Sequence, residues 1–218
     1  MEIVIFGTGD IARLANFYFK TDSQYKPVAF VVDRKYMEMS SFEGLPVVAT
    51  DEVETKYPPG KYRMFIALSY AAMNKYREEK FNYFRSRDYS FVSYVSSRSS
   101  YLSQHPPGDN CFILEDNTIQ PYVRIGNNVT LWSGNHIGHD SSIMDHTFVS
   151  SHVVVSGHCT VKTNCFLGVN ATLRNSITIG DRTLIGAGSI IMHDTEADSV
   201  YVPQKTSSIS KKSYEIKL

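Results

Sequence analysis

Between Ile113 and Ile191 the chain carries a branched aliphatic residue at every sixth position without interruption. This spacing fits neither an amphipathic helix, with about 3.6 residues per turn, nor an alternating strand. A period of six is typical of a hexapeptide β-helix, in which each repeat forms one short strand and its turn. The series comprises Ile113, Ile119, Ile125, Leu131, Ile137, Ile143, Val149, Val155, Val161, Leu167, Leu173, Ile179, Ile185 and Ile191.

Small residues and glycines at two further positions of the repeat also favour a β-helix with regular corners. The residue four after each aliphatic is mostly small, which suits a second inward position: Val129, Ser141, Thr147, Val153, Cys159, Cys165, Ala171, Thr183 and Ser189. The residue directly after the aliphatic is often glycine, as at Gly126, Gly138, Gly168, Gly180 and Gly186. We expect these glycines to form the corners, where they would tolerate a positive φ.

Residues 1–95 follow a different pattern and predict a small α/β domain. Short apolar strands are expected at Glu2–Phe6, Pro27–Val32 and Arg63–Leu68, with helices after the first strand and over Ala71–Arg85. Alternating strands and helices predict a small parallel, Rossmann-like sheet. Since Pro106-Pro107-Gly108 marks a boundary, we expect an α/β domain at 1–95, a β-helix at 106–195 and a tail at 196–218.

Composition narrows the possible partners and environment. The formal net charge is +0, so no general attraction to nucleic acid or to a membrane surface is expected. The first residues lack a basic leader segment, and no apolar stretch is long enough to span a bilayer. Of the three cysteines, Cys159 and Cys165 occupy the small inward position, which favours a packing role and a reduced, cytoplasmic chain.

A glycine-rich turn follows the first predicted strand. Gly7, Gly9 and Asp10 lie in this turn, which opens a helix, and such a turn can present backbone N–H groups and the helix dipole to a phosphate. Asp33 ends the second strand, where a carboxylate could accept hydrogen bonds from a ribose or a base. A tight turn without a ligand is the alternative, and the short domain disfavours full NAD binding.

Five of the seven histidines lie within residues 136–158 of the predicted coil: His136, His139, His146, His152 and His158. His139 has an outward phase, and stacking by eighteen residues sets Gly157 over it, which leaves room for a ligand. Asp140 could orient the imidazole and stabilise its charged form. Solvated surface histidines are the plainer alternative. A metal site is a further option, but no cysteine or carboxylate cluster completes a ligand shell, so we predict no metal.

The two halves together resemble the bacterial sugar acyltransferases of the bacillosamine and perosamine N-acetyltransferase type and of the sialic acid O-acetyltransferase type. The resemblance covers nearly the whole chain. It implies that the α/β domain binds a nucleotide-linked sugar, that a left-handed β-helix binds acetyl-CoA, and that three chains form a homotrimer. The handedness of the coil comes from this resemblance.

The resemblance also assigns roles to single residues. His139 and Asp140 match the catalytic pair, whereas Gly7, Gly9, Asp10 and Asp33 match the substrate-binding turn and its acidic partner. Gly157 matches a glycine beside the thioester arm, and the assigned cofactor-binding set is Gly157, Gly186, Ala187 and Lys205.

Three departures accompany the resemblance. The family often has Glu where this chain has Asp140, and its Gly-Asn-Pro near the end is replaced by Tyr201-Val202-Pro203-Gln204. A second family histidine, nine residues after the first, is Phe148 here. His146 or His152 could take over that role.

These observations predict an acetyl-CoA-dependent N-acetyltransferase acting on the amino group of a nucleotide-linked amino sugar in bacterial surface glycan (O-antigen, lipopolysaccharide) biosynthesis. His139 would be the general base, Asp140 would hold its tautomer, and the Gly157 N–H would stabilise the oxyanion. Trp132 and Phe148, at outward phases, are expected in the trimer interface. The alternatives are a sugar O-acetyltransferase of the same fold and a non-catalytic trimeric scaffold. The sequence does not specify the sugar or the nucleotide base.

Overall fold

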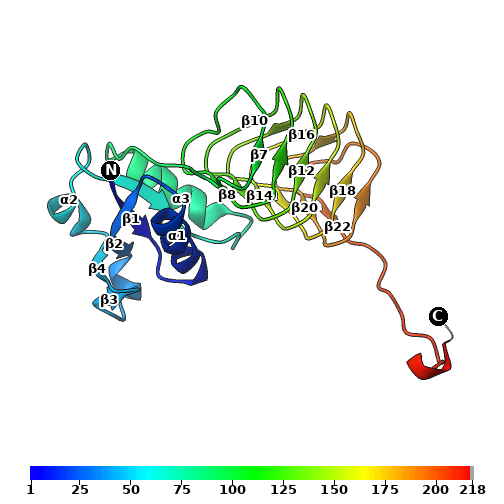
Figure 1. Cartoon of the computed structure of the whole chain (residues 1–218), viewed down its shortest axis with the longest axis horizontal. Helices are drawn as coiled ribbons and strands as arrows, with labels where there is room; N and C mark the ends of the chain where they lie inside the picture. The colour runs from blue at the N-terminus through cyan, green and yellow to red at the C-terminus, as the bar shows by residue number, and fades with distance from the viewer. Residues whose placement is uncertain (217–218) are drawn as a thin grey trace.

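The computed structural model describes residues 1–216 as an α/β domain, an elongated β-helix and a C-terminal tail (Figure 1). The α/β elements, in order, are β1 (Glu2–Phe6), α1 (Asp10–Thr21), β2 (Lys26–Val32), η1 (Arg34–Tyr36), β3 (Ser41–Phe42), β4 (Leu45–Ala49), α2 (Val53–Lys56), β5 (Arg63–Ile66) and α3 (Lys75–Arg85).

The five strands of the α/β domain form one sheet in the order β3-β4-β2-β1-β5. All neighbours are parallel except the short β3, which runs antiparallel to β4. β1 and β2 are buried almost throughout, as expected for strands covered on both faces. The carboxyl ends of β2, β1 and β5 therefore meet at one edge, where parallel sheets commonly bind ligands.

Two turns of this domain depend on left-handed backbone. Gly7 has a φ of 116°, and a Cβ there would lie 2.9 Å from the Ala67 carbonyl oxygen, so this position requires glycine. The helix predicted from Ala71 begins only at Lys75, because Ala72, Met73 and Asn74 all have positive φ.

The second domain is a left-handed parallel β-helix with three ladders of two-residue strands. The ladders run β22-β20-β17-β14-β11-β8-β6, β21-β18-β15-β12-β9-β7 and β10-β13-β16-β19. The strand bounds are β6 (Tyr94–Val95), β7 (Ser100–Tyr101), β8 (Phe112–Ile113), β9 (Thr118–Ile119), β10 (Arg124–Ile125), β11 (Thr130–Leu131), β12 (His136–Ile137), β13 (Ser142–Ile143), β14 (Phe148–Val149), β15 (Val154–Val155), β16 (Thr160–Val161), β17 (Phe166–Leu167), β18 (Thr172–Leu173), β19 (Thr178–Ile179), β20 (Leu184–Ile185), β21 (Ile190–Ile191) and β22 (Val200–Tyr201).

The six-residue period is confirmed as the packing rule of this coil. All fourteen aliphatic positions are buried and lie in one hydrophobic core, together with the three cysteines. Residues eighteen apart pair across each ladder, as Leu131 pairs with Val149 and Ile137 with Val155. The ladders also take in β6, β7 and β22, so they extend beyond the predicted span of 106–195 on both sides.

The corners are built differently from our expectation. A left-handed residue recurs at every sixth position: Asn110, Asp116, Tyr122, Asn128, Gly134, Asp140, His146, His152, His158, Asn164, Asn170, Ser176, Arg182 and Gly188. The predicted corner glycines, 126, 138, 168, 180 and 186, do not have positive φ, so that expectation was wrong. Gly138 and Gly168 are needed for space instead, since a Cβ there would lie 2.5 Å from a backbone nitrogen of the next coil.

The α/β domain packs on the outer face of the longest ladder. Phe148 is buried, stacks on Phe166 at a ring-centroid distance of 5.8 Å, and meets Tyr70 of the α/β domain at 5.0 Å. Trp132 is partly buried and packs against the core cluster that includes Phe65. The prediction that Phe148 lies at an interface between chains is therefore wrong, because the chain's own α/β domain covers this side chain.

After β22 the chain extends away from the coil (Figure 1). Its one regular element is the short 3₁₀ helix η2 (Ser213–Glu215), and residues 202–216 are exposed. Within residues 1–216, no helix combines the length and the apolar character needed to cross a bilayer.

Candidate functional site

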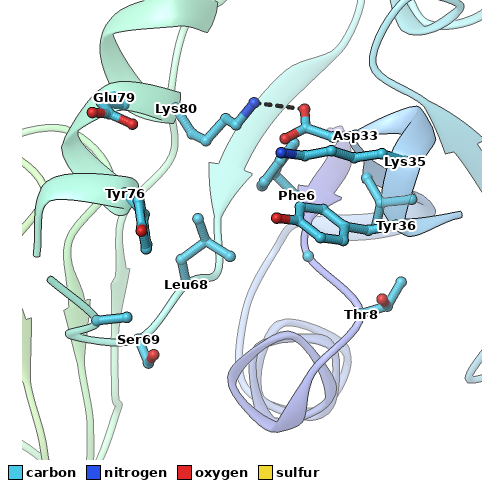
Figure 2. Close-up of a pocket in the computed structure, with 13 residues that line it drawn as sticks. Phe6, Thr8, Asp33, Lys35, Tyr36, Leu68, Ser69, Tyr76, Glu79 and Lys80 are labelled. Carbon is cyan, nitrogen blue, oxygen red and sulfur yellow. Dashed lines mark hydrogen bonds and ion pairs between the residues drawn. The ribbon is translucent and has the colours of Figure 1, made fainter.

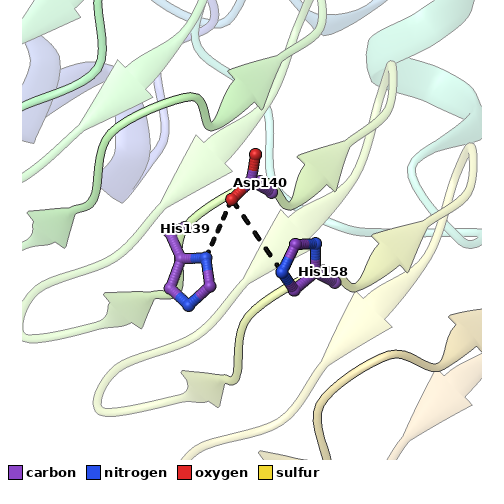
Figure 3. A group of neighbouring side chains, drawn as sticks. All are labelled: His139, Asp140 and His158. Carbon is purple, nitrogen blue, oxygen red and sulfur yellow. Dashed lines mark hydrogen bonds and ion pairs between the residues drawn. The ribbon is translucent and has the colours of Figure 1, made fainter.

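His139 and Asp140 form a hydrogen-bonded pair at the corner that follows β12 (Figure 3). His139 Nδ1 lies 2.8 Å from Asp140 Oδ2, and both side chains are solvent-exposed. The His139 backbone N–H donates to Gln120 Oε1 at 2.8 Å, which anchors the residue to the preceding coil. Asp140 adopts the left-handed conformation that every corner of the coil uses. The repeat itself therefore holds the two side chains together.

Gly157 lies directly over the imidazole, as the eighteen-residue stacking predicted. A Cβ at Gly157 would come within 2.8 Å of His139 Nε2, so glycine leaves the space that this nitrogen faces. Because Asp140 accepts a hydrogen bond at Nδ1, the tautomer with its proton on Nδ1 is favoured. Nε2 then carries the lone pair and can accept a proton.

A third side chain, His158, joins the pair, although the sequence pattern alone did not predict a role for it. His158 Nε2 lies 4.0 Å from Asp140 Oδ2, and its ring stands perpendicular to that of His139, with centroids 4.9 Å apart. The signal was present in the sequence, because His158 follows Asp140 by one eighteen-residue coil.

The other histidines of the sequence cluster lie elsewhere. His146 is at the corner after β13 and is buried, with Nδ1 2.9 Å from Asn128 Nδ2. Burial lowers the pKa of His146, although Glu78, 3.8 Å away, acts in the opposite direction. His152 is exposed at the corner after β14, beside Gly134. Neither therefore joins His139.

His146 belongs to a buried polar cluster between the two domains. The Arg77 guanidinium donates to the His146 carbonyl oxygen at 2.8 Å, to Asn74 Oδ1 at 3.0 Å and to Thr130 Oγ1. Asn74 in turn donates to the Cys165 carbonyl oxygen at 3.0 Å. Burial lowers the pKa of Arg77 to about 10, so the side chain still carries its charge at neutral pH. These contacts fix α3 to the coil.

The α/β domain has a pocket of about 570 Å³ at the carboxyl edge of its sheet (Figure 2). Gly7 and Asp33, both predicted as substrate-binding residues, line it. Gly9 and Asp10 are not among its lining residues; Asp10 is exposed and pairs with Arg13 at 3.2 Å. A Cβ at Gly9 would meet no atom within 4 Å, so nothing in the fold requires glycine there.

The sequence did not predict three features at this pocket. Lys80 Nζ lies 2.5 Å from Asp33 Oδ1, and Thr50 donates to the same oxygen at 3.0 Å. Tyr36 and Tyr76 contribute two large, exposed rings to the lining. Lys80 comes from α3, so the pocket joins two segments far apart in the chain, which local sequence patterns do not reveal.

The predicted cofactor-binding residues beyond Gly157 lie apart from His139 in this chain. Gly186 and Ala187 follow β20 of the longest ladder, whereas His139 follows β12 of another ladder. The Gly186 N–H donates to the Tyr201 carbonyl oxygen at 2.6 Å. Lys205 is exposed in the tail.

The three exposed side chains of Figure 3 are also the group within residues 1–216 whose ligand atoms lie close enough to hold a metal ion, all within 4.8 Å of one another. The sequence predicts no metal, because no cysteine or carboxylate cluster completes a ligand shell around the histidines. The stacking of adjacent turns places His158 beside the His139–Asp140 pair, eighteen residues after Asp140.

Comparison with known proteins identifies the repeat. Residues 122–157 match the family model described as bacterial transferase hexapeptide (six repeats), and residues 161–192 match the hexapeptide repeat of succinyl-transferase. No curated protein sequence matches this chain significantly.

Solved structures share the whole architecture at low sequence identity. A mutant of perosamine N-acetyltransferase from Caulobacter crescentus, in complex with CoA and GDP-perosamine, has a TM-score of 0.82 and 20% identity, and the match covers 96% of this chain and 98% of that one. The acetyltransferase domain of PglB from Neisseria gonorrhoeae gives 0.78 and 18%, with 88% and 92% covered. WeeI from Acinetobacter baumannii gives 0.77 and 16%, with 92% and 96% covered. By its repeats the chain is a hexapeptide-repeat protein, and it shares its fold with perosamine N-acetyltransferase and with the acetyltransferase domain of PglB.

Proposed function

We propose that this protein transfers an acetyl group from acetyl-CoA to the amino group of a nucleotide-linked amino sugar. The observation that carries the proposal is the His139–Asp140 pair beneath Gly157, with Nε2 of His139 facing the position where glycine has no side chain. The shared fold adds support, since its structural relatives include complexes with acetyl coenzyme A and with CoA and GDP-perosamine.

The proposed reaction needs one proton acceptor and no covalent intermediate. The sugar amine attacks the thioester carbonyl, and His139 Nε2 takes the proton that the amine loses. Asp140 keeps Nδ1 protonated and stabilises the imidazolium that forms. The Gly157 N–H is our candidate for stabilising the oxyanion before the CoA thiolate leaves.

The pocket of the α/β domain is the proposed site for the nucleotide. The turn at Gly7 and Thr8 lies at the start of α1, where backbone N–H groups and the helix dipole favour phosphate. The rings of Tyr36 and Tyr76 can pack against a base, and Asp33 can accept hydrogen bonds from a ribose or a base. The volume of about 570 Å³ lies in the range usual for small-ligand pockets.

In a homotrimer, the proposed base, cofactor-binding residues and nucleotide pocket of different chains could form one active site. His139 and the proposed cofactor-binding residues Gly186, Ala187 and Lys205 lie on different parts of the molecule, and the nucleotide pocket is in another domain. We propose that neighbouring copies contribute these parts to one another's sites. If so, mixed trimers of His139→Asn and Gly9→Val chains, assayed at a nucleotide-sugar concentration below KM, will be more active than either variant alone.

The direct test is release of CoA from acetyl-CoA with a panel of nucleotide-linked amino sugars, followed by analysis of the acetylated product. We expect acetylation of the sugar nitrogen. A product acetylated on a hydroxyl would favour an O-acetyltransferase of the same fold. If no sugar promotes CoA release and acetyl-CoA does not raise the melting temperature, the protein is a scaffold.

Gly9→Val tests phosphate binding at the turn beside the pocket, and a Cβ at Gly9 would meet no atom within 4 Å. A branched side chain there would obstruct the approach of a phosphate to the start of α1. We expect a KM for the nucleotide sugar raised by about tenfold or more, with the KM for acetyl-CoA nearly unchanged. Equal changes in both KM values would contradict the assignment.

A further inference from the structure

His139, Asp140 and His158 lie together at one corner of the β-helix, and the dashed contacts join Asp140 to each histidine (Figure 3). One ligand atom from each residue lies within 4.8 Å of the other two, and the Asp140 carboxylate oxygen is 2.8 Å from His139 Nδ1 and 4.0 Å from His158 Nε2. A tetrahedral Zn²⁺ with bond lengths of about 2.0–2.2 Å needs its ligands roughly 3.3–3.6 Å apart. Small side-chain rotations therefore suffice to bring the three atoms to that spacing.

We propose that these three residues bind a divalent transition-metal ion, with Zn²⁺ as the best fit. Two imidazoles and one carboxylate suit Zn²⁺ better than Mg²⁺ or Ca²⁺, which prefer sets made only of oxygen. Three protein ligands leave the fourth position of the ion to water.

The backbone holds the three residues in place before any ion arrives. Asp140 and His158 both occupy the left-handed corner position, with φ of 58° and 59°. The His158 N–H donates to the His139 carbonyl oxygen at 2.9 Å, which joins the two coils at this point. Ordering the ligands thus costs side-chain rotamer freedom only.

The exposure of the group favours access for the ion. The side chains of His139, Asp140 and His158 are 52%, 43% and 58% exposed. A hydrated cation can reach them directly, and its fourth ligand stays in solvent.

Binding would have a consequence for catalysis, and this part of the inference rests on the proposed function. The metal would occupy His139 and draw Asp140 away from its orienting role. Bound Zn²⁺ would therefore inhibit acetyl transfer reversibly, and a chelator would restore it.

The test is isothermal titration of the metal-stripped full chain with Zn²⁺, and it needs no substrate. We expect one ion per chain, with affinity about tenfold or more weaker in His158→Asn, since even the loss of residues that only support metal ligands costs 10–100-fold. His152→Asn is the matched control, because His152 is exposed and left-handed at another corner. Absence of binding, or equal affinity in wild type and His158→Asn, would overturn the proposal.

A second arm separates this inference from the proposed function. In the CoA-release assay, Zn²⁺ should inhibit the wild type, and the inhibitory concentration should rise about tenfold in His158→Asn. If Zn²⁺ binds as described but no sugar is acetylated, the proposed function fails and the metal site stands. If acetylation proceeds and titration detects no Zn²⁺ binding, the metal site fails and the proposed function stands.

Discussion

His146 and His158 occupy the same left-handed corner position in different repeats of the β-helix. One side chain is buried and the other is exposed. His146 is buried beneath α3, and its neighbours are Asn128, Phe81 and the Arg77 cluster. His158 is exposed beside His139 and Asp140. The repeat gives both residues the same φ, and the docking of the α/β domain alone makes one structural and leaves the other accessible.

The comparison explains why histidines concentrate on this coil. Asn, Asp and His are the non-glycine residues most enriched at positive φ, and His146, His152 and His158 all occupy that position. His139 does not, so no backbone requirement accounts for it. A histidine that does not occupy a left-handed corner position is therefore the stronger candidate for a catalytic base.

The largest expected effect comes from removing the base at the exposed corner. We predict that His139→Asn lowers kcat by roughly 10²–10⁴, the usual contribution of general base catalysis. His136→Asn is the matched control, because His136 lies in β12 three residues earlier. Steady-state kinetics decides: loss of activity in His136→Asn with activity retained in His139→Asn would assign the base to His136.

At the buried His146 corner, removal of the Arg77 side chain should lower the stability of the fold. Arg77→Met removes a buried, hydrogen-bonded charge and leaves the His146 carbonyl and Thr130 hydroxyl without their partner. We expect a loss of about 3 kcal/mol in the free energy of unfolding, measured by urea denaturation. Arg85→Ala, which breaks an exposed ion pair with Asp109, should cost less than about 1 kcal/mol. Equal losses in the two variants would show that the buried cluster does not fix the domains.

Two glycines sharpen the distinction between packing and chemistry. Gly157→Ala directs its new methyl group at His139 Nε2, 2.8 Å away, so we expect kcat to fall about tenfold with the melting temperature little changed. Gly138→Ala directs its methyl group at the Gly157 backbone nitrogen, 2.5 Å away, and should instead cost about 1–3 kcal/mol of stability. The opposite pattern, in kinetics and thermal melts, would contradict this distinction.

The smallest effect is a pH dependence at the buried corner. Burial lowers the pKa of His146 in the folded chain. Below about pH 6.5 the unfolded chain therefore binds more protons than the folded chain. As the pH decreases in this range, His146 lowers the free energy of unfolding by at most about 1.4 kcal/mol per pH unit. His146→Asn keeps a side chain suited to the corner, like Asn128 and Asn164. Urea denaturation across this pH range should show a shallower decline for the variant; identical slopes would mean that His146 does not titrate on unfolding.

Much of the coil could be predicted from the sequence because its structure repeats locally. The aliphatic series gave the inward positions, and the eighteen-residue stacking put Gly157 over His139. The same arithmetic would have placed His158 over Asp140. The corner glycines were misassigned because glycine serves two needs, positive φ and close approach, and the sequence does not distinguish them.

By itself, the sequence determined the period, the core and the His139–Asp140 pair, since all three depend on residues that are adjacent or separated by whole repeats. Only the tertiary structure decided which outward residues of the β-helix are covered, since the α/β domain buries Phe148 and His146. The physical reason is that repeat contacts recur at fixed separations along the chain, whereas the docking of two domains joins residues with no such relation.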